Sequence, residues 1–200
     1  DSLSGGTFAF TNANAGTGNK TVTAAGVTVN DGNGGNNYNA VVYVDNTTST
    51  INRADLTLST SAVSKTYDGT LSALGTAVVA AGTLYNNASN GGALDALSGG
   101  TFAFTNANAG AGNKTVTASG VTVNDGNTGG NYNVSYVANT VSTIDKAALT
   151  IGTSDVVKTY DGTVGAAGTA VVTGGTLFTN ASNDNTPDSI SGGSFAFTSK

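Results

Sequence analysis

The sequence predicts an all-β protein built from tandem modules of about 93 residues in an elongated array. Three observations lead to this prediction. Apolar and small polar residues alternate along short segments, which is the two-residue period of half-buried strands. Thr, Val, Asn, Ser and 29 Gly dominate the composition, whereas the helix formers Glu, Gln and Met are absent. Long segments also recur at a constant spacing, which is typical of repeat proteins.

The repeat is visible as letter-for-letter recurrence. The segment LSGGTFAFTNANAG begins at Leu3 and again at Leu97, and a related copy begins at Ile190. The segment KTYDGT begins at Lys65 and again at Lys158, 93 residues later. The expected division is residues 1–53 as the C-terminal part of a repeat, 54–146 as one complete repeat, and 147–200 as the N-terminal part of the next.

The two partial repeats lead us to expect that the chain is an excerpt of a longer polymer. If the natural chain had these same ends, the partial repeats would instead complete one another between molecules by strand addition.

The alternating segments predict antiparallel strands whose apolar faces form the core. Clear examples are residues 54–58, 101–105, 114–117, 121–123 and 132–136. Asp-Gly and Asn-Gly pairs between them predict hairpin turns, because Gly supplies positive φ and Asx side chains bond the local backbone. A β-sandwich-like and a β-grasp-like module both fit this pattern, which does not distinguish them.

The composition argues against several classes of protein. Without Cys, His and Glu, the usual zinc ligands and the commonest general base are missing. Charged residues make up only 10% of the chain and the net charge is −5, so nucleic acid is not an expected partner. No apolar run approaches the length of a membrane span. We therefore expect no enzymatic activity, no cofactor and no insertion into a membrane.

Several segments resemble the YDG repeat of large bacterial surface adhesins, namely SKTYDGT, GTFAFTNANAGAGNKTVTASGVTVND, GGNYNVSY and ANTVSTIDKAALTI. The resemblance covers essentially the whole chain and is to filamentous-haemagglutinin-like proteins of the two-partner-secretion type. It implies a secreted protein of the bacterial cell surface that takes part in adhesion or biofilm formation. The motif residues are Lys65, Tyr67, Asp68, Gly69, Lys158, Tyr160, Asp161 and Gly162.

Three functions follow as hypotheses. The leading one is a structural stalk or filament segment whose partners are the neighbouring repeats, with matrix or host glycans bound by other domains. The alternative is a self-assembling extracellular filament or matrix protein in which the repeats bind identical chains, because low charge and strong β propensity favour association. The third is a sugar-binding module in which Tyr67 and Tyr160 stack on a sugar. For these rings we favour packing under the hairpin of the adjoining Asp-Gly turn.

The sequence contains two further kinds of candidate site. The Asn-rich loops at residues 30–37 and 124–131 resemble calcium loops, with Asp31 and Asp125 as candidate ligands. Each loop has a single carboxylate, fewer than calcium sites use, so we expect ordinary Asx-turn loops and no metal. Asn-x-Ser/Thr sequons are candidate glycosylation sites. They begin at Asn19, Asn46, Asn87, Asn113, Asn133 and Asn180.

Overall fold

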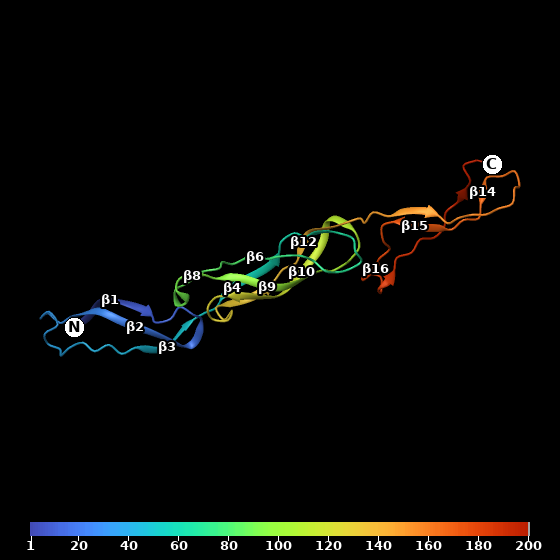
Figure 1. The fold of residues 1–200 in the computed structure, drawn as a ribbon. Coiled ribbons are helices and arrows are strands. Elements are labelled where there is room, and N and C mark those ends of the chain that lie inside the picture. The colour runs from blue at the N-terminus through green and yellow to red at the C-terminus, as the bar shows by residue number, and fades with distance from the viewer. Residues whose placement is uncertain (200) are drawn as a thin grey trace. The chain divides into compact units, whose positions relative to one another are not determined.

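The computed structural model describes residues 1–199, which form β-strands joined by turns and contain no α-helix (Figure 1). The prediction of an all-β fold is confirmed. A single turn of 3-10 helix, η1 (Ala88–Asn90), lies between two short strands. Within the described residues no helix has the length and apolarity needed to span a bilayer.

Contacts divide the chain into two compact units. The first unit comprises residues 1–59, 77–101 and 118–137, and the second comprises residues 60–76, 102–117 and the described chain from residue 138 onward. Each unit therefore combines residues from more than one copy of the sequence repeat.

The first unit contains two three-stranded sheets and one short hairpin. The antiparallel sheet has the order β1 (Ser2–Phe10), β2 (Gly16–Asn30), β3 (Asn46–Ile51). The other sheet has the order β11 (Tyr132–Tyr136), β4 (Ala54–Thr60), β6 (Ala77–Ala81). The hairpin pairs β7 (Asn86–Asn87) with β8 (Ala93–Leu94), and η1 forms its turn.

The second unit is built around a four-stranded sheet. Its order is β5 (Ser64–Thr66), β12 (Asn139–Asp145), β10 (Gly110–Asn124), β9 (Ala96–Phe104), and β9 and β10 also contribute residues to the first unit. Three two-stranded pairs follow along the chain. They are β13 (Thr150–Thr153) with β15 (Ala170–Gly174), β14 (Gly165–Ala166) with β18 (Phe195–Ala196), and β16 (Thr179–Asn180) with β17 (Thr186–Pro187).

The prediction of antiparallel pairing was wrong for the segments 54–58 and 132–136. Strands β4 and β11 pair in parallel, with Leu56 opposite Val134, and β5 pairs in parallel with β12. Parallel neighbours need a long connection that returns the chain to the same end of the sheet. Here that connection is most of the repeat, so the local pattern of alternation carries no information about strand direction.

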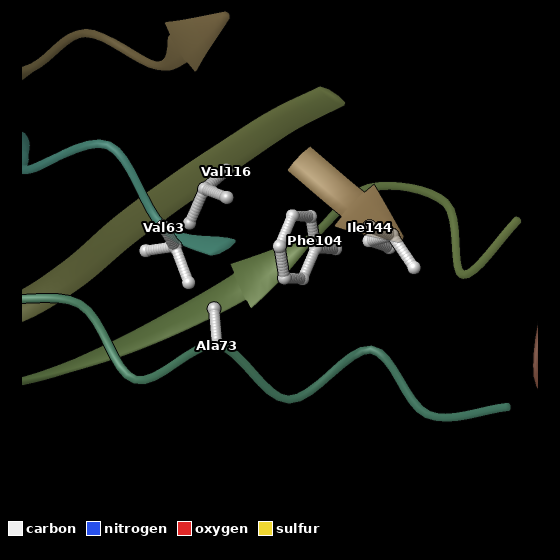
Figure 2. Close-up of a cluster of buried hydrophobic side chains, with 5 residues drawn as sticks. All are labelled: Val63, Ala73, Phe104, Val116 and Ile144. Atoms are coloured by element: carbon white, nitrogen blue, oxygen red, sulfur yellow. The ribbon is translucent and has the colours of Figure 1, made fainter. Parts of the chain in front are cut away.

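Each unit has its own cluster of buried apolar side chains, drawn from alternate positions of its strands. In the first unit the cluster consists of Leu56, Leu58, Val123 and Tyr132. In the second unit it consists of Val63, Ala73, Phe104, Val116 and Ile144. Figure 2 shows the other four side chains around the Phe104 ring. The polar residues between them, such as Thr57 and Thr117, are not buried, as the two-residue period requires.

Burial differs strongly between sequence counterparts, by which we mean positions 93 or 94 residues apart in the repeat. Phe104 is 1% exposed, whereas its counterpart Phe10 is 45% exposed. Leu58 is 0% exposed, whereas its counterpart Ile151 is 53% exposed. The same position of the repeat is therefore buried within residues 54–146 and exposed within residues 1–53 or 147–199.

This difference predicts unequal effects of the same substitution. We expect Phe104→Ala to lower the free energy of unfolding by about 3–5 kcal/mol, because it leaves a cavity in a closed cluster. We expect Phe10→Ala to lower it by less than half of that amount. Equilibrium unfolding in urea, followed by tyrosine fluorescence, measures both variants, and equal losses would contradict the difference in burial.

Candidate interface between sequence repeats

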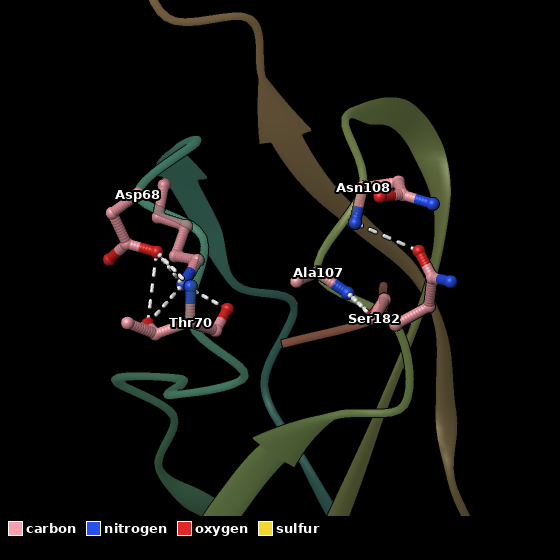
Figure 3. A network of polar contacts seen from close by, with 7 residues as sticks. Asp68, Thr70, Ala107, Asn108 and Ser182 are labelled. Atoms are coloured by element: carbon pink, nitrogen blue, oxygen red, sulfur yellow. Dashed lines mark hydrogen bonds and ion pairs between the residues drawn. The ribbon is translucent and has the colours of Figure 1, made fainter. Parts of the chain in front are cut away.

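The first Tyr-Asp-Gly motif forms a compact turn closed by its own polar groups. The Lys65 ammonium lies 2.7 Å from Asp68 Oδ1 and donates to the Thr70 carbonyl oxygen at 2.9 Å. Asp68 Oδ1 also accepts hydrogen bonds from the Thr70 backbone N–H and hydroxyl, both at 2.9 Å (Figure 3). Burial by itself would raise the pKa of Asp68, but the bonds from Lys65 and Thr70 outweigh it and lower that pKa.

The second motif repeats this arrangement. Lys158 Nζ lies 2.7 Å from Asp161 Oδ1, and the Thr163 backbone N–H donates to the same oxygen at 2.9 Å. The hydrogen bond from Lys158, followed by those from Thr163, lowers the pKa of Asp161. Because the two turns have the same internal bonds, the sequence motif specifies the turn wherever it occurs.

The first turn contacts the β16–β17 hairpin, which belongs to the next copy of the repeat. The Tyr67 hydroxyl donates to Asp188 Oδ2 at 2.8 Å, and the Tyr67 ring meets the Phe178 ring edge-on with centroids 5.7 Å apart. The Ala181 N–H donates to the Gly69 carbonyl oxygen at 2.8 Å. Burial, with the bond to Asp188, raises the pKa of the Tyr67 hydroxyl. The predicted packing of this Tyr is thus against the hairpin of another copy.

Gly69 is the point of closest approach in this contact. Its φ is +78°, and a Cβ atom added to it would overlap the Thr179 carbonyl oxygen. Its counterpart Gly162 has φ +76° but nothing within 4 Å of the position of a Cβ. Tyr160 is likewise 84% exposed, so the predicted packing under a hairpin is wrong for this residue.

A neighbouring loop, residues 106–109, contacts the same hairpin. The Ala107 N–H donates to Ser182 Oγ at 2.7 Å, a bond drawn in Figure 3. Asn180 Nδ2 donates to Asn108 Oδ1 at 2.9 Å. The turn and the loop, both within one copy of the repeat, therefore hold the hairpin of the following copy.

The loop contacts occur a second time in the first unit, at the counterpart residues. The Ala13 N–H donates to Ser89 Oγ at 2.7 Å, and Asn87 Nδ2 donates to Asn14 Oδ1 at 2.9 Å. The Ala15 N–H donates to Asn131 Oδ1 at 2.8 Å. The first two of these bonds join the same atoms at the same distances in both units, whereas the bond from Ala15 is seen in the first unit alone among the described residues.

The two Asn-rich loops have the geometry of Asx turns. Asp125 Oδ1 accepts from the N–H groups of Asn127 and Gly129, both at 2.8 Å, and Oδ2 accepts from that of Asn131 at 2.9 Å. The Asp31 carboxylate closes its loop with equivalent bonds from Asn33, Gly35 and Asn37. No cluster of three or more potential metal-ligating acids is found in the described part of the chain.

These bonds account for the charge of a buried aspartate. Burial by itself would raise the pKa of Asp125, but three backbone N–H donors outweigh it and lower that pKa. Bonds from Gly35, Asn33 and Asn37, in that order, lower the pKa of Asp31. The Asp125 loop also supports the interface, because its backbone carbonyl oxygen accepts from Asn87 Nδ2 at 2.6 Å.

The six sequon residues fall into two groups. Asn19, Asn46, Asn113 and Asn133 are exposed. Asn87 is buried, and Asn180 is half-buried, and the side-chain amides of both donate across the interface. For Asn87 and Asn180 the folded chain thus supplies a structural role that the sequence analysis did not consider.

A second tyrosine–aspartate pair lies in the first unit. Tyr132 Oη donates to Asp95 Oδ2 at 2.5 Å and accepts from the Tyr85 N–H at 3.0 Å. Burial, followed by the bond to Asp95, raises the pKa of Tyr132 to about 12. Neither Asp95 nor Ser89 was identified from the sequence, since single Asp and Ser residues do not stand out in so polar a chain.

The comparisons with known proteins agree with the motif. A YDG domain spans residues 52–141. This match contains the first Tyr-Asp-Gly turn, β4 to β11 and the first residues of β12. Comparison with curated proteins and with solved structures gives no match.

The two glycines provide a matched pair of variants. Gly69→Ala and Gly162→Ala impose the same strain at positive φ, about 1–2 kcal/mol, but only the former also pushes against the Thr179 carbonyl. We expect Gly69→Ala to speed hydrogen exchange at the Ala181 amide and Gly162→Ala to leave that rate unchanged. Exchange measured by NMR tests this, and an equal response to both variants would refute the contact.

The raised pKa of Tyr132 predicts an alkaline transition. The neutral hydroxyl stabilises the fold fully below the unfolded pKa of about 10, and this contribution is lost as the pH rises towards the folded value of about 12. Unfolding in urea at pH 9, 10 and 11 should give a free energy of unfolding that decreases as the pH rises. Tyr132→Phe should flatten this dependence, and an unchanged slope in the variant would assign the transition elsewhere.

Proposed function

We propose that the chain is a structural segment of a secreted bacterial surface adhesin, forming part of a stalk or filament used in adhesion or biofilm formation. The YDG domain at residues 52–141 supports this proposal at the level of sequence. The location at the bacterial cell surface follows from the same resemblance and is part of the proposal.

The observation that carries the proposal is the recurrence of one set of contacts. Ala13 with Ser89, and Ala107 with Ser182, are joined by the same bond at 2.7 Å. Repeat proteins gain stability from nearest-neighbour interfaces that are used again at each step. An interface that recurs with the sequence period is what a stalk of regular spacing needs.

The chemistry of this interface suits neighbours in one chain. It consists largely of neutral hydrogen bonds, which backbone N–H groups donate to Ser hydroxyls and Asn amides donate to Asn oxygens, each worth about 0.5–1.5 kcal/mol. The effective concentration of linked neighbours is high, so modest contacts suffice to order them. Between separate molecules the same bonds would have to overcome the cost of association.

We also propose that the protein is not an enzyme. Its carboxylates in the turns and loops are engaged in holding backbone N–H groups or Lys side chains, as Asp68 and Asp125 illustrate. The absence of His, Cys and Glu from the sequence removes the commonest general base and nucleophilic thiolates.

Self-association of the repeats is a second candidate function, and one observation favours it. Large apolar side chains are exposed outside residues 54–146, including Phe8, Phe10, Tyr160 and Ile151. Exposed apolar surface beside open strand edges promotes pairing with other chains. Sugar binding has less support at Tyr67, because that ring already packs against Phe178 in a T-shaped pair.

Inserting further copies of residues 54–146 after residue 146, which keeps the period, tests the stalk. Small-angle X-ray scattering should give a maximum dimension that grows by a constant increment for each added copy. Flexibly linked modules would instead give growth with roughly the square root of the copy number. That result would contradict the stalk.

A matched control weakens the interface without touching the cores. Ser182→Ala, with the equivalent serine changed in each inserted copy, removes one bond per step and should broaden the distribution of dimensions. Sedimentation velocity on the same samples detects lateral or head-to-tail association, which would favour the self-assembly alternative.

A further inference from the structure

Two tyrosine–aspartate bonds in this chain involve the same position of the hairpin. Asp95 directly follows β8 and accepts a hydrogen bond from the Tyr132 hydroxyl. Asp188 directly follows β17 and accepts a hydrogen bond from the Tyr67 hydroxyl at 2.8 Å. The two aspartates are sequence counterparts, but the two tyrosines are not. One carboxylate position of the repeat therefore has two different tyrosine donors.

The carboxylate has the same place on the hairpin in both units. The Asp95 N–H donates to the Tyr85 carbonyl oxygen at 2.9 Å. The Asp188 N–H donates to the carbonyl oxygen of Phe178, the counterpart of Tyr85, at 2.7 Å. The bond from the Asn loop to the hairpin serine is also the same in both units, at 2.7 Å. A donor that is observed on one aspartate can therefore be placed on the other.

The two tyrosines reach this position from different copies of the repeat. Tyr132 lies on β11, in the same copy as the aspartate that it bonds. Tyr67 follows β5, in the copy before that of its aspartate. The Tyr132 hydroxyl also accepts from the Tyr85 N–H at 3.0 Å, whereas the Tyr67 ring packs against the ring at the same hairpin position, that of Phe178. Because one tyrosine contacts the backbone and the other contacts the ring, the two donors do not compete for one contact.

One carboxylate has the capacity for both bonds. An ionised Asp has two equivalent oxygens that together offer about four acceptor positions. Asp95 is 3% exposed and binds Tyr132 through Oδ2, while its Oδ1 is buried and has no hydrogen-bond partner within residues 1–199. A buried polar oxygen is costly without a donor, so a second hydroxyl at Oδ1 would stabilise the fold.

We propose that Asp95, in a copy that follows another copy in the same chain, is an acceptor shared by two tyrosines. One of its oxygens binds the Tyr67 hydroxyl of the preceding copy, and the other binds the Tyr132 hydroxyl of its own copy. This inference rests on the proposed function, in which successive copies within one chain are joined by the same contacts.

A shared acceptor couples the folding of a copy to its joint with the copy before it. Strand β11 pairs with β4 of the same copy, so Tyr132 reaches the carboxylate only when these two strands have come together. Tyr67 reaches it only when the turn of the preceding copy is docked. A carboxylate that one tyrosine already holds in place loses less freedom when the second tyrosine binds. Completion of each copy therefore strengthens its joint with the preceding one.

A chain with one copy of residues 54–146 inserted after residue 146 contains all three arrangements of the carboxylate. Asp95 of the first copy has Tyr132 alone, Asp188 has Tyr67 of the inserted copy alone, and Asp95 of the inserted copy has both donors. The carboxyl ¹³C resonance of each aspartate reports on its hydrogen bonds in NMR spectra. These resonances are assigned by replacing the three aspartates with Asn, one at a time.

Tyr→Phe substitutions remove each hydroxyl and keep its ring. Tyr67→Phe in the first copy and Tyr132→Phe in the inserted copy should each shift the carboxyl resonance of Asp95 in the inserted copy. As matched controls, Tyr132→Phe in the first copy should shift only Asp95 of that copy, and Tyr67→Phe in the inserted copy should shift only Asp188. If Asp95 of the inserted copy responds to one tyrosine alone, or to neither, the shared acceptor is refuted.

Hydrogen exchange at the Ala88 amide separates this proposal from the proposed function. Ala88 is the counterpart of Ala181, whose N–H donates to the Gly69 carbonyl oxygen, so a docked turn should slow exchange at Ala88 of the inserted copy. Ala88 of the first copy gives the reference rate. Slow exchange in the inserted copy together with a response of Asp95 to Tyr132 alone would leave the joint in place and overturn the sharing. Equal exchange rates at the two Ala88 amides would contradict the joint itself, and with it both proposals.

Discussion

The paired hydroxyl and carboxylate of Tyr and Asp at the base of the hairpin constrain the rest of the interface. A carboxylate placed among apolar side chains must be hydrogen-bonded. Asp188 accepts a hydrogen bond from Tyr67, and one oxygen of Asp95 accepts one from Tyr132. Because Tyr67 directly follows β5 and Tyr132 lies on β11, the Tyr–Asp bonds fix where these two strands lie. The hairpin, the Tyr-Asp-Gly turn and the Asn loop then have defined positions around it.

Short polar side chains, rather than long charged ones, provide most of the side-chain hydrogen bonds in the loops and at the interface. Asp31 and Asp125 each close a loop by accepting from three backbone N–H groups, and Asn and Ser side chains bond backbone groups across the interface. Side chains of one or two carbons lose little conformational entropy when they are fixed. A chain with only 10% charged residues can therefore satisfy its loops while residues 1–199 form salt bridges only within the two Tyr-Asp-Gly turns.

Much of the secondary structure follows from local sequence, and the pairing does not. Alternation located the strands that contain Leu56, Val116 and Tyr132, because burial of every second residue is a local property. The parallel pairing of β4 with β11 depends on a connection of more than seventy residues. The sequence of either strand therefore does not indicate the direction of its neighbour. The unequal burial of Phe10 and Phe104 likewise depends on which strands lie nearby.

The candidate site was predicted in part. The recurrence of Tyr67 and Gly69 indicated a structural motif, but not its partner, because the partner lies more than a hundred residues away. Ser89 and Ser182 were not recognised, since neither residue type nor spacing sets them apart. The recurring sequons at Asn87 and Asn180 were the available signal, but a sequon by itself indicates only a candidate glycosylation site.

A Tyr-Asp-Gly turn and, after it, a hairpin of the kind that receives such a turn are both encoded in residues 54–146 and again in residues 147–199. A gene segment of one period therefore encodes both a Tyr-Asp-Gly turn and a hairpin that can bind a turn of the same type. Duplication or loss of whole periods by recombination would always join a matching pair, so the number of copies could drift in a lineage without any new interface having to evolve. An insertion that broke the period would instead move a turn away from the hairpin that binds it. Selection would therefore preserve the length of the repeat.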